Sequence, residues 1–457
     1  MRQFFTRLDP HFHPMILALR EFEKEIETSN QFEVFSYAVE RHDGYTYRKD
    51  MNILKGPQAM EKNFRMLERL IKSVLWVVGG YKIHLSGNAE LANQLKHAFS
   101  DRGIRKFDVV FMGKAFGQPF EVHIVDFDHL PLEKKCSIPV GRNLDGCRIG
   151  FDAGGSDRKV SAVINGEVVY SEEVVWLPKV TSDPKYHFDG IVDSLKRAAS
   201  KMPNVDAIGV SSAGIYIDNL VRAASLFLQV NEEDFDRHVR DIYIRAAREI
   251  GDVPLEVAND GDVTALAGSM DLKDANVLGI AMGTSEAVGY INSDGNLNGW
   301  LSELAFVPVD FYPSAIVDEW SGDYGCGVKY FSQDAVIKLA ASAGIPMDEE
   351  LTPAEKLKVI QQRMKNNDPL AREIFETIGI YLGYTLPYYA LFYEIKHVLI
   401  LGRVTSGEAG TIILNQAKAV LKEEFPELSG IHLILPDESS RRVGQSIAAA
   451  SLPKLRK

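Results

Sequence analysis

Apolar and polar residues follow each other along the chain with two periods, one typical of helices and one of strands. The first part of the chain contains stretches with the helical period. Residues 15–27 and 59–74 place apolar side chains at the spacing of an amphipathic helix. Residues 88–103 predict a third helix, because Asn88 is a suitable N-cap and Gly103 a suitable stop. The N-terminal part is therefore expected to contain at least three helices.

Strand-like stretches alternate with these helices. Residues 74–87 predict a strand with a Gly-Gly bend, and residues 106–127 predict the two strands of a hairpin. Residues 130–146 combine Pro, Lys and Gly and predict a linker. We therefore expect residues 1–140 to form an α+β domain, whose role the sequence does not assign.

Beyond the linker, strand and helix patterns alternate, which predicts an α/β architecture. The stretch IGFDAGGSDRKVSAVING, residues 149–166, predicts two strands around a Gly-Gly turn, with Asn165-Gly166 as a type I′ turn. The Gly-Gly turn can present backbone N–H groups to a phosphate, and Asp152 can face a cation. An ordinary hairpin remains the alternative for this stretch taken alone.

A similar glycine hairpin occurs about 130 residues later. It is VLGIAMGTSEAVGYINSDG, residues 277–295, again strand, small polar turn and strand. Two such hairpins suggest two related lobes, which we expect at residues 147–270 and 271–457.

A polar loop follows the predicted strand 253–257. Here Asp260 can accept a proton from a substrate hydroxyl and Asn259 can orient that hydroxyl. Asp262 is a fitting N-cap for the helix that follows. The alternative is that Asp260 and Asp262 only cap the turn.

Composition and charge exclude several classes of protein. The chain has 457 residues and a net charge of −12, and no strongly basic stretch suggests nucleic-acid binding. No apolar run approaches the ~20 residues of a membrane span, and the first residues lack a secretory pattern. The three cysteines, Cys136, Cys147 and Cys326, fit a reducing compartment rather than a disulfide framework. We expect a cytoplasmic protein without nucleic-acid or membrane partners.

Taken in order, the motifs resemble those of the ROK family of sugar kinases and regulators, within the actin/hexokinase/Hsp70 superfamily. The resemblance covers residues 147–455, about two-thirds of the chain. It implies a two-lobed actin-like ATPase (ribonuclease H-like) fold and a homodimer. The matching segments are DAGGS (152–156), AIGVSSAGIYID (207–218), VANDGDVTALAG (257–268), MGTSEAVGYI (282–291), HVLILGRVTSGEAG (397–410) and the closing helix (435–453).

The resemblance implies ATP, Mg²⁺ and a sugar as ligands. Asp260 would be the general base, and Asp152 would hold Mg²⁺ through water. Asn259, Asp260, Glu303 and Gln333 would contact the sugar. The nucleotide phosphates and the adenosine side would be bound by Asp152, Gly154, Gly155, Ser156, Gly283, Thr284, Ser285 and Gly402.

The chain departs from the family pattern near the sugar site. Phe306 occupies the position of a family histidine, and Gln333 replaces a glutamate. In the family's zinc motif, Tyr324 and Phe331 occupy cysteine positions, and only Cys326 remains. Zinc needs four N, S or O ligands, so we expect no structural zinc and a loop stabilised by aromatic packing.

Two further departures concern the nucleotide side. Glu286 places a carboxylate after the second turn, which is unfavourable beside a phosphate unless it faces Mg²⁺ or solvent. Arg403 follows Gly402 where the family has glycine, and either stacks on adenine or obstructs it.

The sequence thus predicts ATP-dependent phosphorylation of a sugar hydroxyl. The alternative is a non-catalytic regulator that binds a sugar or nucleotide in the same cleft. A superfamily ATPase activator with an iron–sulfur centre is disfavoured, because the three cysteines are scattered.

Overall fold

The computed structural model describes residues 4–135, 139–436 and 438–455. Cys136 lies outside these residues. The chain forms two compact units, each assembled from separate segments. Unit 1 comprises Met1–Cys136, Ile280–Ala287 and Trp300–Leu435, and unit 2 comprises Ser137–Gly279, Val288–Gly299 and Pro436–Lys457. No helix in the described part of the chain is long and apolar enough to cross a membrane.

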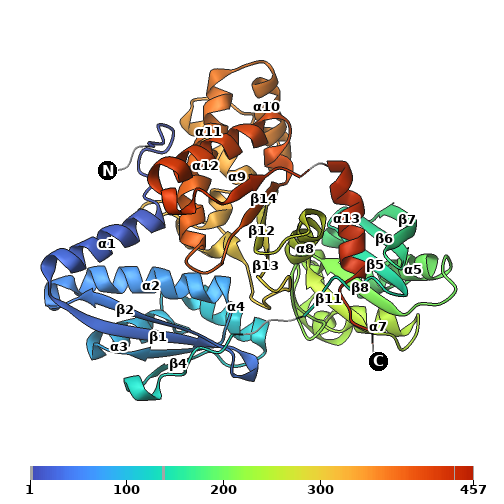
Figure 1. Cartoon of the computed structure of the whole chain (residues 1–457), viewed down its shortest axis with the longest axis horizontal. Helices are drawn as coiled ribbons and strands as arrows, with labels where there is room; N and C mark the ends of the chain where they lie inside the picture. The colour runs from blue at the N-terminus through green and yellow to red at the C-terminus, as the bar shows by residue number, and fades with distance from the viewer. Residues whose placement is uncertain (1–3, 136–138, 437, 456–457) are drawn as a thin grey trace. The chain divides into compact units, whose positions relative to one another are not determined.

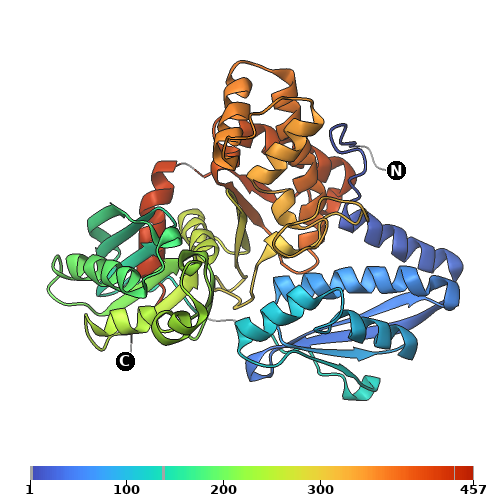
Figure 2. The same ribbon diagram turned by 180° about the vertical axis from the view of Figure 1, so that it is seen from behind.

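The N-terminal part of unit 1 is a four-stranded sheet with helices, as the mixed pattern predicts. The strand order is β2-β1-β3-β4, and α2 runs alongside the sheet in both views (Figures 1 and 2). The middle of β1 is buried on both faces, since all residues from Phe35 to Val39 are buried. The strands are β1 Phe32–Glu40, β2 Thr46–Leu54, β3 Lys82–Ser86 and β4 Glu121–Ile124, and the helices are α1 Met15–Ser29, α2 Met60–Val77, α3 Ala89–Ala98 and α4 Lys106–Phe116.

Two of the expected elements in this part were wrong. Residues 74–77 continue α2 as helix, and the strand begins only at Lys82. Residues 106–116 form helix α4 instead of the first strand of a hairpin. Asn88 does cap α3, since its side chain accepts the N–H of Leu91, but the helix ends at Ala98.

The remainder of unit 1 is mostly helical and contains β14, β15 and the adjoining ends of β12 and β13 from a second sheet of order β13-β12-β14-β15. Helices α11 and α12 pack on each other, and Gly383 of α11 allows their close approach, because an added Cβ would lie 2.5 Å from Val420. The helices are α9 Gln333–Ser342, α10 Pro353–Lys365, α11 Pro369–Tyr389 and α12 Glu408–Glu424, and the strands are β12 Val277–Met282, β13 Glu286–Ile291, β14 His397–Leu401 and β15 His432–Ile434.

Unit 2 is built on a five-stranded sheet of order β11-β8-β5-β6-β7. The neighbouring strands β5, β8 and β11 are parallel, so their carboxyl ends lie at one edge. Helix α13 packs directly on β5 and β8 (Figure 1), where Gly150 and Gly209 leave no room for a Cβ. The strands are β5 Cys147–Ala153, β6 Asp157–Ile164, β7 Glu167–Val175, β8 Ala207–Ser212, β9 Ile215–Ile217, β10 Leu220–Ala223 and β11 Leu255–Asn259, and the helices are α5 Pro184–Ala199, α6 Glu232–Asp234, α7 Ile242–Arg248, α8 Asp260–Leu272 and α13 Glu438–Ala450.

The hairpin predicted at residues 149–166 is present. Strands β5 and β6 pair antiparallel, with Asp152 opposite Lys159. Asn165 and Gly166 both have positive φ, at 51° and 85°, as a type I′ turn after β6 requires.

Candidate functional site

The first glycine turn joins β5 to β6 and is held by a tryptophan. The indole Nε1 of Trp176 donates to the carbonyl of Gly154 at 2.7 Å, and the Trp176 N–H donates to the carbonyl of Ser156. An added Cβ on Gly154 would lie 2.6 Å from the Asp157 carbonyl. The turn is therefore tight and has no room for larger side chains.

Asp152 lies at the carboxyl end of β5, opposite Ser211 of β8. The Ser211 hydroxyl donates to Asp152 Oδ1 at 2.8 Å, which fixes the carboxylate at the edge of the sheet. Burial raises the pKa of Asp152 although the Ser211 hydrogen bond lowers it. A carboxylate with this environment gains from a bound cation, which would restore its charged form.

Asp260 is the first residue of α8 and follows the end of β11. Its pKa is raised to about 6, first because of burial and second because of the nearby negative charge of Asp152. The structure thus brings these two carboxylates close enough to influence each other. A carboxylate with a pKa near neutrality is well suited to accept a proton from a hydroxyl group.

Asn259 is the N-cap of α8, a role that the sequence analysis predicted for Asp262. Asn259 Oδ1 accepts the N–H of Gly261 and caps α8, while its Nδ2 donates to the Gly214 carbonyl. Asp262 instead lies inside the helix, where burial raises its pKa to about 7. The expected N-cap role of Asp262 was therefore wrong, and the sugar contact of Asn259 stays a prediction.

Behind the two carboxylates lies a hydrogen-bonded group that the sequence did not reveal. The hydroxyls of Tyr216 and Tyr243 donate to Ser212 Oγ at 2.6 and 2.9 Å. Ser212 is paired with Asn259 in the sheet, so this group supports the edge that carries Asp260. Such residues carry no distinctive spacing, because they come from three separate elements.

Lys179 is a second residue that sequence reasoning missed. It is exposed, and its Cε would lie 2.6 Å from a Cβ added to Gly155. Its charge also lowers the pKa of Asp260. A cation beside a turn of backbone N–H groups is a typical phosphate contact, so Lys179 joins Gly154, Gly155 and Ser156 as a candidate.

The second set of predicted residues lies on unit 1. Gly283 accepts the backbone N–H of Gln333 at 2.9 Å, and Thr284 and Ser285 are exposed in the turn between β12 and β13. Gly402 has a φ of 105°, and a Cβ there would lie 2.3 Å from the Met282 carbonyl. The ends of β12 and β14 and the start of α9 therefore meet at this turn.

The sequence predicts Glu286 to be unfavourable beside a phosphate unless it faces Mg²⁺ or solvent. Glu286 does not face solvent. It is buried, and its Oε1 accepts the Tyr389 hydroxyl at 3.4 Å. Burial raises its pKa to about 8, and the nearby Glu303 adds to the shift. At pH 7 most Glu286 side chains are therefore protonated, so this residue adds little negative charge near the turn.

The loop around Cys326 is stabilised by aromatic packing and by charge. Phe306 lies against Trp76, with ring centroids 4.3 Å apart, and the Arg69 guanidinium lies over the Tyr324 ring. Burial raises the pKa of the Cys326 thiol to about 12. Among the described residues, no group of three or more His, Cys, Asp or Glu side chains is arranged to hold a metal ion. The absence of zinc nevertheless stays a prediction.

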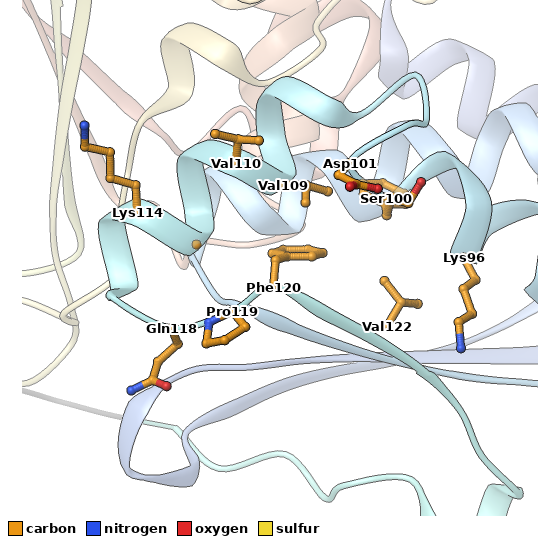
Figure 3. Close-up of a pocket in the computed structure, with 12 residues that line it drawn as sticks. Lys96, Ser100, Asp101, Val109, Val110, Lys114, Gln118, Pro119, Phe120 and Val122 are labelled. Carbon is orange, nitrogen blue, oxygen red and sulfur yellow. The ribbon is translucent and has the colours of Figure 1, made fainter.

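A groove of about 470 Å³ lies between α3, α4 and β4 of the N-terminal sheet (Figure 3). Phe120 and Val122 line it on one side and Val109 on the other, with Lys96 and Lys114 at its rim. None of the predicted site residues lines this groove.

Comparisons with known proteins support the fold. No family model matches the chain, and no curated protein matches it by sequence. A ROK hexokinase from Thermus thermophilus matches in structure with a TM-score of 0.52 and 16% identity, over 66% of this chain and 97% of that chain. A ROK family transcriptional regulator, a homolog of the E. coli MLC protein, matches with a TM-score of 0.51 and 17% identity, over 79% and 87%. The chain therefore has the α/β fold of these ROK proteins.

Proposed function

We propose that this chain, which shares the fold of ROK hexokinases and regulators, is an ATP-dependent sugar kinase. The observation that carries the proposal is the position of Asp260 at the carboxyl end of the parallel strands β5, β8 and β11, with a pKa raised to about 6 by burial and by Asp152. Ligands of open α/β sheets bind at this edge. A base with this pKa is deprotonated at neutral pH and still basic enough to assist a hydroxyl.

In the proposed reaction Asp260 accepts the proton of a sugar hydroxyl. The sugar oxygen then forms a bond to the γ-phosphorus of ATP, while the bond from that phosphorus to the β–γ bridging oxygen breaks and ADP leaves. The proton stays on Asp260 until solvent removes it. Phosphoryl transfer of this kind depends on positioning and charge neutralisation, which suits turns and cations rather than a covalent nucleophile.

Mg²⁺ fits the residues present. Burial raises the pKa values of both Asp152 and Asp260, so a bound cation would favour their charged forms. Asp152 would hold the ion through water, and the ion would neutralise phosphate oxygens. Lys179 and the N–H groups of the 154–156 turn would bind the phosphates, and Glu303 and Gln333 the sugar.

Glu286 poses less of an obstacle than its sequence position suggests. A charged carboxylate beside the β-phosphate would weaken nucleotide binding. Because burial keeps most of Glu286 protonated at pH 7, this repulsion is largely absent. Arg403 is exposed, and its role toward adenine stays a prediction.

A coupled assay of ADP release tests the proposal. Mg²⁺–ATP is offered with a panel of hexoses, N-acetylhexosamines and sugar acids to the wild type, to Asp260→Asn and to the matched control Asp262→Asn. Sugar-dependent ADP release that only the Asp260 change abolishes supports a kinase. If no sugar stimulates release but a sugar raises the melting temperature, the chain is a non-catalytic regulator instead.

The regulator is the second candidate, and one observation favours it. The N-terminal domain contacts the segment that carries Glu303, as its backbone hydrogen bonds to residues 301–303 show. A domain in this position can transmit sugar binding elsewhere.

A further inference from the structure

The backbone of residues 301–303 is hydrogen-bonded to the C-terminal end of helix α2. The last carbonyls of a helix have no partner within the helix and need an external donor. In α2 these carbonyls receive three consecutive N–H groups from residues 301–303. The pairs are Leu301 with Val78 at 3.2 Å, Ser302 with Val77 at 2.9 Å and Glu303 with Trp76 at 3.0 Å.

Trp76 also contacts this segment through its side chain. Its ring lies 4.3 Å from that of Phe306, which ends the short helical turn that begins after Glu303. Its indole Nε1 donates to Asp108 Oδ1 of α4 at 2.5 Å. Trp76 is fully buried, so one residue fixes the backbone of Glu303 and the side chain of Phe306 together.

A buried ionic cluster fixes α2 and α4 to the loop after residue 320. Asp323 accepts both Arg69, at 2.9 Å, and Arg105, at 2.7 Å, and Lys72 Nζ lies 2.6 Å away. Burial alone would raise the pKa of Asp323, but Lys72, Arg69 and Arg105 lower it far below its usual range. The carboxylate is therefore charged and fully committed to the three cations.

The same cluster reaches Trp76. Lys72 Nζ lies 3.4 Å from Asp108 Oδ1, the atom that accepts the Trp76 indole. Arg105 lies 3.6 Å from the other Asp108 oxygen. The contacts thus form one connected path from Asp323 through Asp108 to Trp76, which we call the α2 clasp.

We propose that the α2 clasp makes the N-terminal domain part of the sugar site, with Trp76 as the positioning residue for Glu303. This inference rests on the proposed role of Glu303 as a sugar ligand. The backbone of Glu303 is held by the end of a helix rather than by a free loop, so its position is set before the sugar arrives. Loosening the clasp displaces Glu303 and weakens sugar binding, while the phosphate turns on other elements are untouched.

A double-mutant cycle tests the positioning role. Trp76→Phe keeps an aromatic ring but removes the donor to Asp108. We expect about a tenfold rise in the sugar KM, since small misplacements of a binding group have effects of this size. The ATP KM and kcat should change little. In a Glu303→Gln background, the same Trp76 change should have no further effect on the sugar KM, because Trp76 acts through Glu303.

A destabilised control separates positioning from general loosening. Leu91→Ala removes a buried side chain of α3 outside the clasp, and should lower the melting temperature without changing the sugar KM. Hydrogen exchange gives a readout independent of activity: the amides of Leu301, Ser302 and Glu303 should exchange about tenfold faster in Trp76→Phe than in Leu91→Ala.

The outcomes distinguish a failure of this inference from a failure of the proposed kinase activity. If no sugar is phosphorylated but one binds, its Kd by calorimetry replaces KM in the same cycle, and the inference is still decided. Equal effects of Trp76→Phe with and without Glu303→Gln overturn it. So does a sugar affinity unchanged by Trp76→Phe, or a binding site that does not respond to Glu303→Gln at all.

Discussion

Lys72 and Asp323 form an ion pair of 2.6 Å in which neither side chain is more than 4% exposed. The two residues lie far apart in the sequence: Lys72 is in α2, and Asp323 is in the loop after residue 320. Removing charges from water is costly, and the cost is recovered only when every charge in the group has partners. The cluster therefore links α2 and α4 of the N-terminal domain to the loop after residue 320, with Asp323 as the anion that three of its cations share.

Asp323→Asn should be strongly destabilising. The change leaves Arg69, Lys72 and Arg105 buried without their common anion, and breaking a buried group in this way typically costs about 3–5 kcal/mol. Urea denaturation measures the free energy of unfolding. As a control, Glu373→Gln removes the partner of the exposed Arg7, and should leave stability nearly unchanged. Similar effects of both changes would contradict the account of the cluster.

The sequence predicted the glycine hairpin of unit 2 and most of helix α2, but it missed the last turn of α2 and the helical state of α4. The hairpin has local turn chemistry, with Asn165-Gly166 setting the register. The last residues of α2, Val74–Val77, are all apolar and buried, so they lack the polar positions that would have identified them as helix. In α4, Phe107, Val109, Val110 and Phe111 are residues that favour strands, and the structure instead packs Phe107 and Phe111 on Trp76 from a helix.

The candidate site was predictable only where the chemistry is local. Asp152 lies at the end of one strand and Asp260 follows another, at recognisable positions, and the structure brings them together in unit 2. Lys179 and Asp323 had no such signal, because each acts through a contact with a distant segment. Tertiary packing decides these roles.

Glu286→Gln should stabilise the protein at alkaline pH. The folded pKa of about 8 lies above the ordinary value of 4.5, so folding keeps a proton that the unfolded chain loses. Stability from this group is complete below about pH 4.5 and declines as pH rises through about 8. Glutamine mimics the protonated form, and should gain about 2–4 kcal/mol over wild type by about pH 9.

Denaturation curves of both proteins at several pH values measure this difference. They should coincide near about pH 5 and separate progressively above it. The exposed Glu376→Gln serves as the control, with no pH-dependent separation expected. Parallel curves for wild type and Glu286→Gln would show that Glu286 is charged throughout.

The pH profile of the kinase reaction should decline on its acid side with a midpoint near pH 6. Asp260 acts in its deprotonated form, so kcat/KM for the sugar should fall about tenfold for each pH unit below about 6. Asp262→Asn should retain this decline, because Asp262 is not the base. A profile that stays flat to about pH 4 would assign the proton transfer to another group.

Lys179→Met should weaken nucleotide binding. The change keeps the alkyl chain beside Gly155 and removes the charge, so the KM for Mg²⁺–ATP should rise about tenfold while the sugar KM stays constant. Lys185→Met removes an exposed charge paired with Asp189 and serves as the control. Equal ATP KM values for the two variants would exclude Lys179 from the phosphate site.

The most direct test of the kinase proposal is mass spectrometry of the sugar after incubation with Mg²⁺ and ATP. The account predicts a sugar phosphate formed by the wild type and by Asp262→Asn, and none by Asp260→Asn. If no sugar in the panel is phosphorylated by the wild type, or if Asp260→Asn forms the product at the wild-type rate, the central claim is contradicted.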